Sequence, residues 1–117
     1  MSNAPVIDPE AIANLRALCT EDDSFLREVV DIFLSDTPER LAELKVSFSA
    51  QDAPGFIRAA HTMKGSASNL GAARMRAQAE HLELTAKKAG LTGLEPEIST
   101  LEHEFAEARI ELQKMLA

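Results

Sequence analysis

A stripe of large apolar residues, running from residue 26 to residue 48, constrains the fold more than any other feature of the sequence. The stripe consists of Leu26, Val30, Phe33, Leu41, Leu44 and Phe48, and Thr37 fills its one gap. Spacing of three or four residues places these side chains on one face of an α-helix. Pro38 lies inside the run and removes one backbone hydrogen bond, to the carbonyl of Leu34. Because the stripe keeps its phase across the proline, we predict one long kinked helix rather than two helices.

Shorter apolar stripes predict four more helices. Asp8 and Asp52 can each cap a helix, and a proline follows each of them within two residues, in the first turn. Gly71 and Gly90 suit the ends of the third and fourth helices, and Pro96 suits the first turn of the fifth. The stripes are Ile12, Leu15 and Leu18; Phe56, Ala60, Met63, Ala67 and Leu70; Met75, Ala79, Leu82 and Ala86; and Leu101, Phe105, Ala108, Leu112 and Met115.

The whole pattern predicts an all-α fold. The 117 residues suit one domain, and no segment shows the alternation of a strand. Aromatic residues make up only 4% of the chain, so the core must be mainly aliphatic. Short connections favour antiparallel neighbours. We therefore expect an antiparallel up-and-down four-helix bundle with a short N-terminal capping helix, in which residues 1–7 are a flexible N-terminus and residues 8–117 form the domain.

The charge and cysteine content exclude several classes of function. A formal net charge of −7 argues against binding to nucleic acid or to an anionic membrane surface. The single cysteine, Cys19, cannot form an intramolecular disulfide and is expected to be a small apolar residue at the end of the first helix. No apolar run could span a bilayer, and the N-terminus lacks the blocks of a signal peptide. We expect a cytoplasmic protein.

The third predicted helix carries a second, polar stripe. His61, Lys64, Gly65 and Ser68 follow helical spacing, and the centre of this stripe lies about 120° from the centre of the apolar one. Glycine inside a helix costs about 1 kcal/mol relative to alanine, so Gly65 calls for an explanation. A missing side chain lets a bulky group approach the neighbouring imidazole. A free ring nitrogen is a competent nucleophile near neutral pH, and Lys64 can meet incoming negative charge.

This stripe suits a phosphoryl group placed on His61, stabilised by Lys64, with room for a partner above Gly65. The pattern also fits an unreactive surface histidine, a solvated lysine and a close helix crossing at the glycine, and the spacing does not decide between the two. His81 and His103 are expected to be solvated, because the histidine spacings match no familiar metal site.

Three segments resemble histidine-containing phosphotransfer (HPt) domains. AAHTMKGSASNLGAARM, beginning at residue 59, resembles the family signature. AEHLE at residues 79–83 resembles the fourth-helix segment, and FLREVVDIFLSDTPERLAEL, from residue 25, resembles the long second helix with its proline. The likeness extends from about Val6 to Met115.

The resemblance implies a phosphorelay intermediate. His61 would accept a phosphoryl group, at its outer ring nitrogen, from a receiver aspartate or a histidine kinase and pass it to a receiver aspartate. Lys64 matches the phosphate-stabilising lysine, and Gly65 matches the glycine that opens space for the receiver. Glu83 would lie where a polar residue of the neighbouring helix can approach the histidine. Such a chain is a phosphocarrier rather than an enzyme. It needs no cofactor of its own, with Mg²⁺ expected on the partner receiver.

The sequence is compatible with several alternatives. Ile57 and Ser68 are candidates for the rim of the receiver-docking surface, but Ile57 equally suits the shoulder of the bundle. The chain could be an HPt domain of a larger hybrid or chemotaxis-type histidine kinase, or a helical adaptor that carries no phosphate. We expect response regulator receiver domains and a histidine kinase as partners, and a monomeric state.

Overall fold

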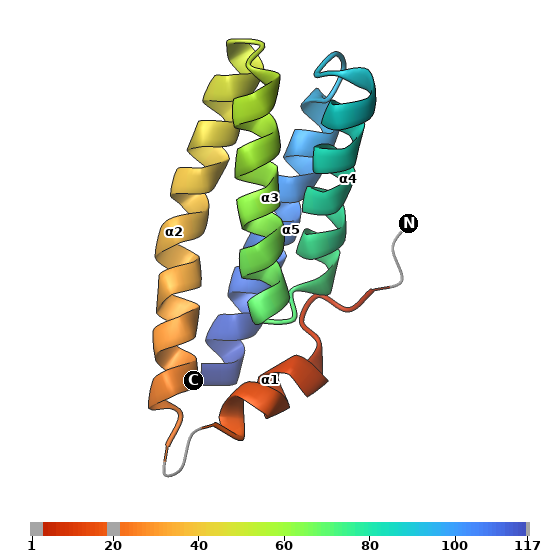
Figure 1. Ribbon diagram of the computed structural model, residues 1–117. Helices are drawn as coiled ribbons and strands as arrows, with labels where there is room; N and C mark the ends of the chain where they lie inside the picture. The colour runs from red at the N-terminus through yellow and green to blue at the C-terminus, as the bar shows by residue number, and fades with distance from the viewer. Residues whose placement is uncertain (1–3, 19–21, 117) are drawn as a thin grey trace.

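The computed structural model describes residues 4–18 and 22–116, and these residues form five α-helices. The helices are α1 (Pro9–Arg16), α2 (Ser24–Ser49), α3 (Ala53–Asn69), α4 (Ala73–Ala89) and α5 (Glu95–Leu116). Helices α2 to α5 run alternately up and down, and α1 lies across the lower end of the bundle (Figure 1). The α3 helix packs between α2 and α4, and α5 closes the bundle against α4 and α2. This is the predicted architecture.

The predicted apolar stripes form one continuous core, except that Leu18, which lies beyond the end of α1, is exposed. Phe56, Leu44, Met63, Met75 and Leu101 are among the side chains that are fully buried. Phe33 and Phe105 make an edge-to-face contact between α2 and α5, with ring centroids 5.5 Å apart. Aliphatic side chains supply most of the remaining core, as the low aromatic content predicted. These four packed helices provide the rigid support on which the polar stripe of α3 lies.

The residues predicted to cap helices, and the proline within α2, have the expected effects on the helices. Asp8 and Asp52 cap α1 and α3, accepting hydrogen bonds from the backbone N–H groups of Glu10 and Gly55. The α2 helix continues unbroken through Pro38, so the prediction of one long helix is confirmed. Thr37, the polar residue in its apolar stripe, is buried. In the segments that the structure describes, no helix is both long enough and apolar enough to cross a membrane.

The N-terminal segment differs from the expectation that residues 1–7 are flexible. Ile7 is buried, and Val6 packs against the core. The carbonyls of Ala4 and Pro5 accept hydrogen bonds from Arg74, at 2.7 Å from Nε and 3.2 Å from the backbone N. Residues 4–7 therefore belong to the folded unit, because two apolar side chains and a partner arginine fix a segment too short to show helical periodicity. Residues 1–3 and the expected position of Cys19 lie outside the described residues.

Candidate functional site

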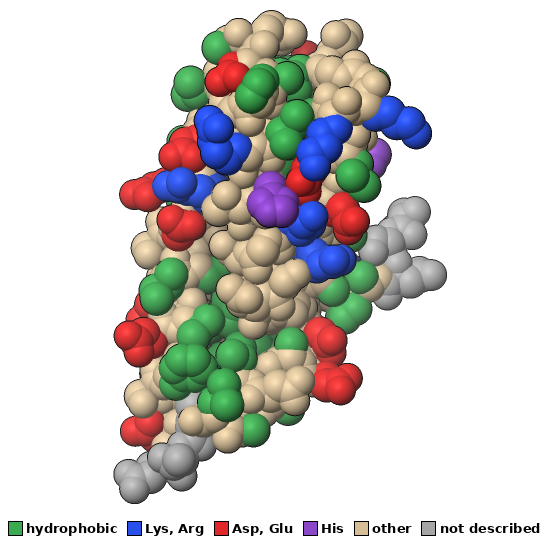
Figure 2. Space-filling model, in the orientation of Figure 1, with side chains coloured by type: hydrophobic (Ala, Val, Ile, Leu, Met, Phe, Trp, Pro, Cys, Tyr) green, Lys and Arg blue, Asp and Glu red, His purple; other side chains and the backbone are tan. Residues whose placement is uncertain are grey.

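His61 stands in the middle of the exposed face of α3. Its side chain is 66% exposed, and the neighbouring Gly65 is also exposed, whereas Met63 between them points into the core. Figure 2 shows a histidine at the centre of this face with basic side chains gathered around it. The predicted separation of a polar stripe from the apolar stripe of α3 is therefore confirmed, and the His61 ring is open to a visiting group.

The space beside the ring is open as well. A Cβ atom placed on Gly65 would meet no other atom within 4 Å. The glycine is therefore not required by a close helix crossing, which was the structural explanation for its presence. Ser68, one turn farther along, is exposed and accepts a hydrogen bond of 2.9 Å from Arg76 Nε of α4. Ile57 is only partly exposed and packs against the core, at the shoulder of the bundle.

Glu83 reaches this site from the adjacent helix α4. Its position lies within the inward-facing stripe of that helix, between Leu82 and Ala86, and its side chain is only 4% exposed. A carboxylate in such a place needs positively charged or hydrogen-bonding partners, since burial without them costs several kcal/mol. Three partners meet this need, two of them from α3 and one from α4 itself.

The three partners divide between the two carboxylate oxygens. His61 Nδ1 lies 3.0 Å from Oε2, and Lys87 Nζ lies 3.2 Å from the same oxygen. Lys64 Nζ lies 2.9 Å from Oε1, in an ion pair that is not aligned as a hydrogen bond. Burial by itself raises the pKa of Glu83, but Lys64, Lys87 and His61 outweigh that effect and lower the pKa from 4.5 to about 2. Glu83 is therefore ionised at neutral pH.

The ionised carboxylate determines which nitrogen of the neutral imidazole carries the hydrogen. A carboxylate can only accept hydrogen bonds, so the short contact requires that His61 Nδ1 carries the hydrogen and donates it. The other ring nitrogen, Nε2, is then left with its lone pair. The arrangement provides an exposed nitrogen nucleophile whose orientation and tautomer are held by a buried anion.

The structure joins the predicted residues into one site and adds a lysine that the sequence analysis missed. His61, Lys64, Gly65 and Glu83 form one site, with Ser68 on its edge. Lys87 was missed, although its spacing of four residues from Glu83 is the spacing of an ion pair along a helix. His81 and His103 are exposed, away from the core. Among the described residues, no group of three or more His, Cys, Asp or Glu side chains is placed to hold a metal ion.

The fold and the site together define a four-helix bundle that presents an exposed histidine paired with a buried carboxylate. Comparison with known families agrees: residues 28–116 match the model of the Hpt domain. Phosphorelay intermediate protein rdeA of Dictyostelium discoideum is 31% identical over 86 residues, which are 74% of this chain and 34% of that protein. The chain thus aligns with about a third of that relative's length.

Solved structures support the same assignment. Histidine-containing phosphotransfer protein B (HptB) from Pseudomonas aeruginosa PAO1 is 31% identical and superposes with a TM-score of 0.86, covering 97% of this chain and 96% of that chain. Histidine-containing phosphotransfer protein ZmHP2 from maize shares the fold, with 23% identity, a TM-score of 0.84 and coverage of 95% and 83%. The chain belongs to the Hpt domain family, and the resemblance noted in the sequence is confirmed.

Proposed function

We propose that this chain is the phosphocarrier of a multistep phosphorelay. It accepts a phosphoryl group on His61 from a receiver aspartate or a histidine kinase and passes it to a receiver aspartate. The observation that carries the proposal is the pairing of the exposed His61 ring with buried Glu83, 3.0 Å from Nδ1, in a member of the Hpt family. An unreactive surface histidine has no need of a buried carboxylate behind it.

The chemistry follows from the tautomer. The lone pair of Nε2 attacks the phosphorus of an aspartyl phosphate; a P–N bond forms, the P–O bond to the aspartate breaks, and the aspartate leaves as a carboxylate. No proton has to leave His61, since Nδ1–H stays in its hydrogen bond to Glu83. The ring gains positive charge as the P–N bond forms, and the nearby Glu83 carboxylate stabilises that charge. The return reaction to a second receiver uses the same atoms in reverse.

Other requirements of the transfer belong to the partner. The phosphoryl oxygens must be neutralised and the reacting atoms held in line, usually with Mg²⁺. We expect the metal and its carboxylate ligands on the receiver domain. Open space at Gly65 suits the approach of that domain. In this proposal the chain is a carrier rather than an enzyme, and phosphohistidine is its transient product.

The test is transfer from a phosphorylated receiver in the presence of Mg²⁺. We expect acid-labile, base-stable phosphate on the chain, and we expect His61→Gln to abolish it. His81→Gln is the matched control, because His81 is also an exposed helix histidine but lies on α4. Label that survives His61→Gln would refute the assignment of the site.

The source of the label separates the alternatives. Transfer from receivers supports the relay. Transfer only from an ATP-fed histidine kinase supports a domain that works within a larger hybrid or chemotaxis-type kinase. Absence of label from both sources favours a helical adaptor and refutes the proposed phosphotransfer.

A further inference from the structure

Glu83 binds two lysines in the free protein, although one carboxylate can neutralise only one of them. Lys64 and Lys87 both lie within 3.2 Å of its oxygens, and the His61 ring donates to it as well. One lysine therefore carries a positive charge that the carboxylate does not balance. Which lysine can leave Glu83 for an arriving phosphoryl group depends on what each would leave behind.

The two oxygens differ in how many partners they have. Oε1 has Lys64 as its one partner among the described residues, so withdrawal of Lys64 would leave a buried carboxylate oxygen without any. Oε2 has two partners, and withdrawal of Lys87 would leave it with the His61 Nδ1–H. Leaving a buried charged acceptor unpaired is costly. The structure thus favours release of Lys87 over release of Lys64.

Exposure points the same way. The Lys64 side chain is 25% exposed, held between α3 and α4, whereas the Lys87 side chain is 53% exposed. A more exposed lysine on a flexible stem can turn to a new partner with less loss of packing.

Phosphorylation itself changes the balance at Oε2. Transfer to Nε2 makes the ring cationic, and its Nδ1–H then faces Oε2 as a charged donor at the 3.0 Å position seen here. The ring charge takes over the role of the Lys87 ammonium at that oxygen. At the same moment a phosphoryl group with about two negative charges stands on the outer side of the ring.

We propose that Lys87 is the mobile cation of this site: it exchanges Glu83 Oε2 for the phosphoryl oxygens, while Lys64 stays on Oε1 and holds the carboxylate. The inference rests on the proposed function in taking His61 Nε2 as the phosphoryl acceptor. It reassigns the main phosphoryl-neutralising role from Lys64, which the family resemblance suggested, to a residue on the neighbouring helix.

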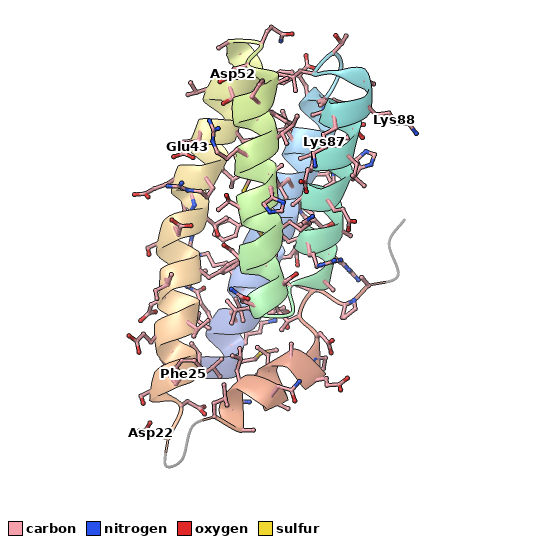
Figure 3. All side chains as sticks on the ribbon, in the orientation of Figure 1. Asp22, Phe25, Glu43, Asp52, Lys87 and Lys88 are labelled. Carbon is pink, nitrogen blue, oxygen red and sulfur yellow. The ribbon has the colours of Figure 1, made fainter. Side chains whose placement is uncertain are left out.

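The chain offers a matched control for Lys87. Lys88 is the next residue of α4, equally basic and exposed, and it extends away from α3 while Lys87 lies on the side facing it (Figure 3). Substitution of either lysine removes one positive charge from the same turn of the same helix. Of these two lysines, only Lys87 contacts Glu83 in the described structure.

The experiment measures the rate at which phosphoramidate, a small phosphodonor that needs no partner, phosphorylates His61 in the intact chain. We expect Lys87→Ala to slow the reaction about tenfold through the loss of one charge-assisted contact to the phosphoryl group. Lys87→Arg should restore most of the rate and Lys88→Ala should leave it unchanged. Lys64→Ala should instead lower the urea midpoint of unfolding, since it leaves Oε1 unpaired.

A second readout separates phosphoryl contact from a merely structural role. The ¹⁵N shifts of the His61 ring report its tautomer, and we expect Lys87→Ala to leave them as in the wild type, whereas Glu83→Gln shifts them. A wild-type rate in Lys87→Ala overturns the proposal. A tautomer change in Lys87→Ala as large as that in Glu83→Gln also overturns it. If receivers fail to transfer phosphate to the chain while phosphoramidate labels it normally, the relay is refuted. The phosphoramidate rates of the Lys87 variants still decide this inference, because that reaction needs no receiver.

Discussion

Substitution of Gly65 by alanine should make the protein more stable and less active at once. Gly65 lies inside α3 with helical neighbours on both sides, and an added methyl group would meet no atom within 4 Å. Alanine in a helix interior is favoured over glycine by about 1 kcal/mol. Since nothing in the structure opposes that gain, we expect Gly65→Ala to raise the melting temperature by about 4 °C.

The same methyl group should obstruct transfer. Our account of Gly65 is that a partner approaches the His61 ring across the bare backbone. A methyl group that displaces the partner's reacting aspartate from its in-line position loses part of the benefit of positioning, which supplies several kcal/mol in such reactions. We expect transfer from a phosphorylated receiver to slow at least about tenfold, which corresponds to 1.4 kcal/mol in the barrier.

Two measurements on each variant test this reasoning: thermal unfolding by circular dichroism, and single-turnover transfer from a phosphorylated receiver. Gly55→Ala is the control within the same helix. Its methyl group would collide with the Asp52 carboxylate that caps α3 and would lie 2.7 Å from Ser47 Oγ of α2, at a position six residues before His61. We expect Gly55→Ala to gain no stability and to transfer normally.

Either half of the result can refute the account. A less stable Gly65→Ala would mean that the glycine serves the fold. A more stable variant with wild-type transfer would mean that no partner uses the space, and that the glycine is an unexplained flaw in the helix.

Three further predictions concern stability, each measured by urea unfolding. Thr37→Val should raise the free energy of unfolding by about 1 kcal/mol, because the Thr37 hydroxyl is buried with no hydrogen-bond partner in the described structure; a loss would mean that the hydroxyl is bonded. Gly71→Ala should lower it by about 1–2 kcal/mol, because Gly71 has φ +66° and an added Cβ would press on α1 at Ala11 and Asp8; an unchanged midpoint would contradict this. Because its pKa is lowered to about 2, Glu83 stabilises the fold more when ionised than when protonated, and this difference is fully present above pH 4.5 and is lost as the pH falls towards 2. The loss should amount to at most about 3 kcal/mol, and Glu83→Gln should flatten this acid slope; an equal slope in both proteins would refute the assignment.

The sequence predicted those features that depend on a single helix. The heptad-like stripe of α2 predicted one helix through Pro38 and put Thr37 on the apolar face, where it is buried, because both follow from helical phase alone. The polar stripe placed His61 and Gly65 on the open face of α3 for the same reason. A resemblance to HPt domains then gave these residues roles that spacing could not assign.

Contacts between elements lay beyond reasoning from one helix, and only the approach of Glu83 to His61 was anticipated, through the resemblance. The meeting of Lys64 and Lys87 on one carboxylate depends on how α4 is rotated against α3, and no local pattern specifies that rotation. A signal did exist, since Glu83 interrupts the inward stripe of α4 where an apolar residue is expected. The packing of Val6 and Ile7 was missed because two residues are too few to show a period.

The interruption at Glu83 also shows what the site costs the fold. A bundle gains little from a buried carboxylate with cations around it, and replacing buried ion pairs by well-packed apolar residues is often neutral or stabilising. An apolar residue at position 83 would complete the stripe formed by Leu82 and Ala86. Folding alone therefore gives no reason for an acid here. The ring that it faces does, because a carboxylate on the inner side of His61 keeps the proton on Nδ1 and leaves Nε2 free, and in the proposed transfer it would offset the charge that the ring acquires with the phosphoryl group.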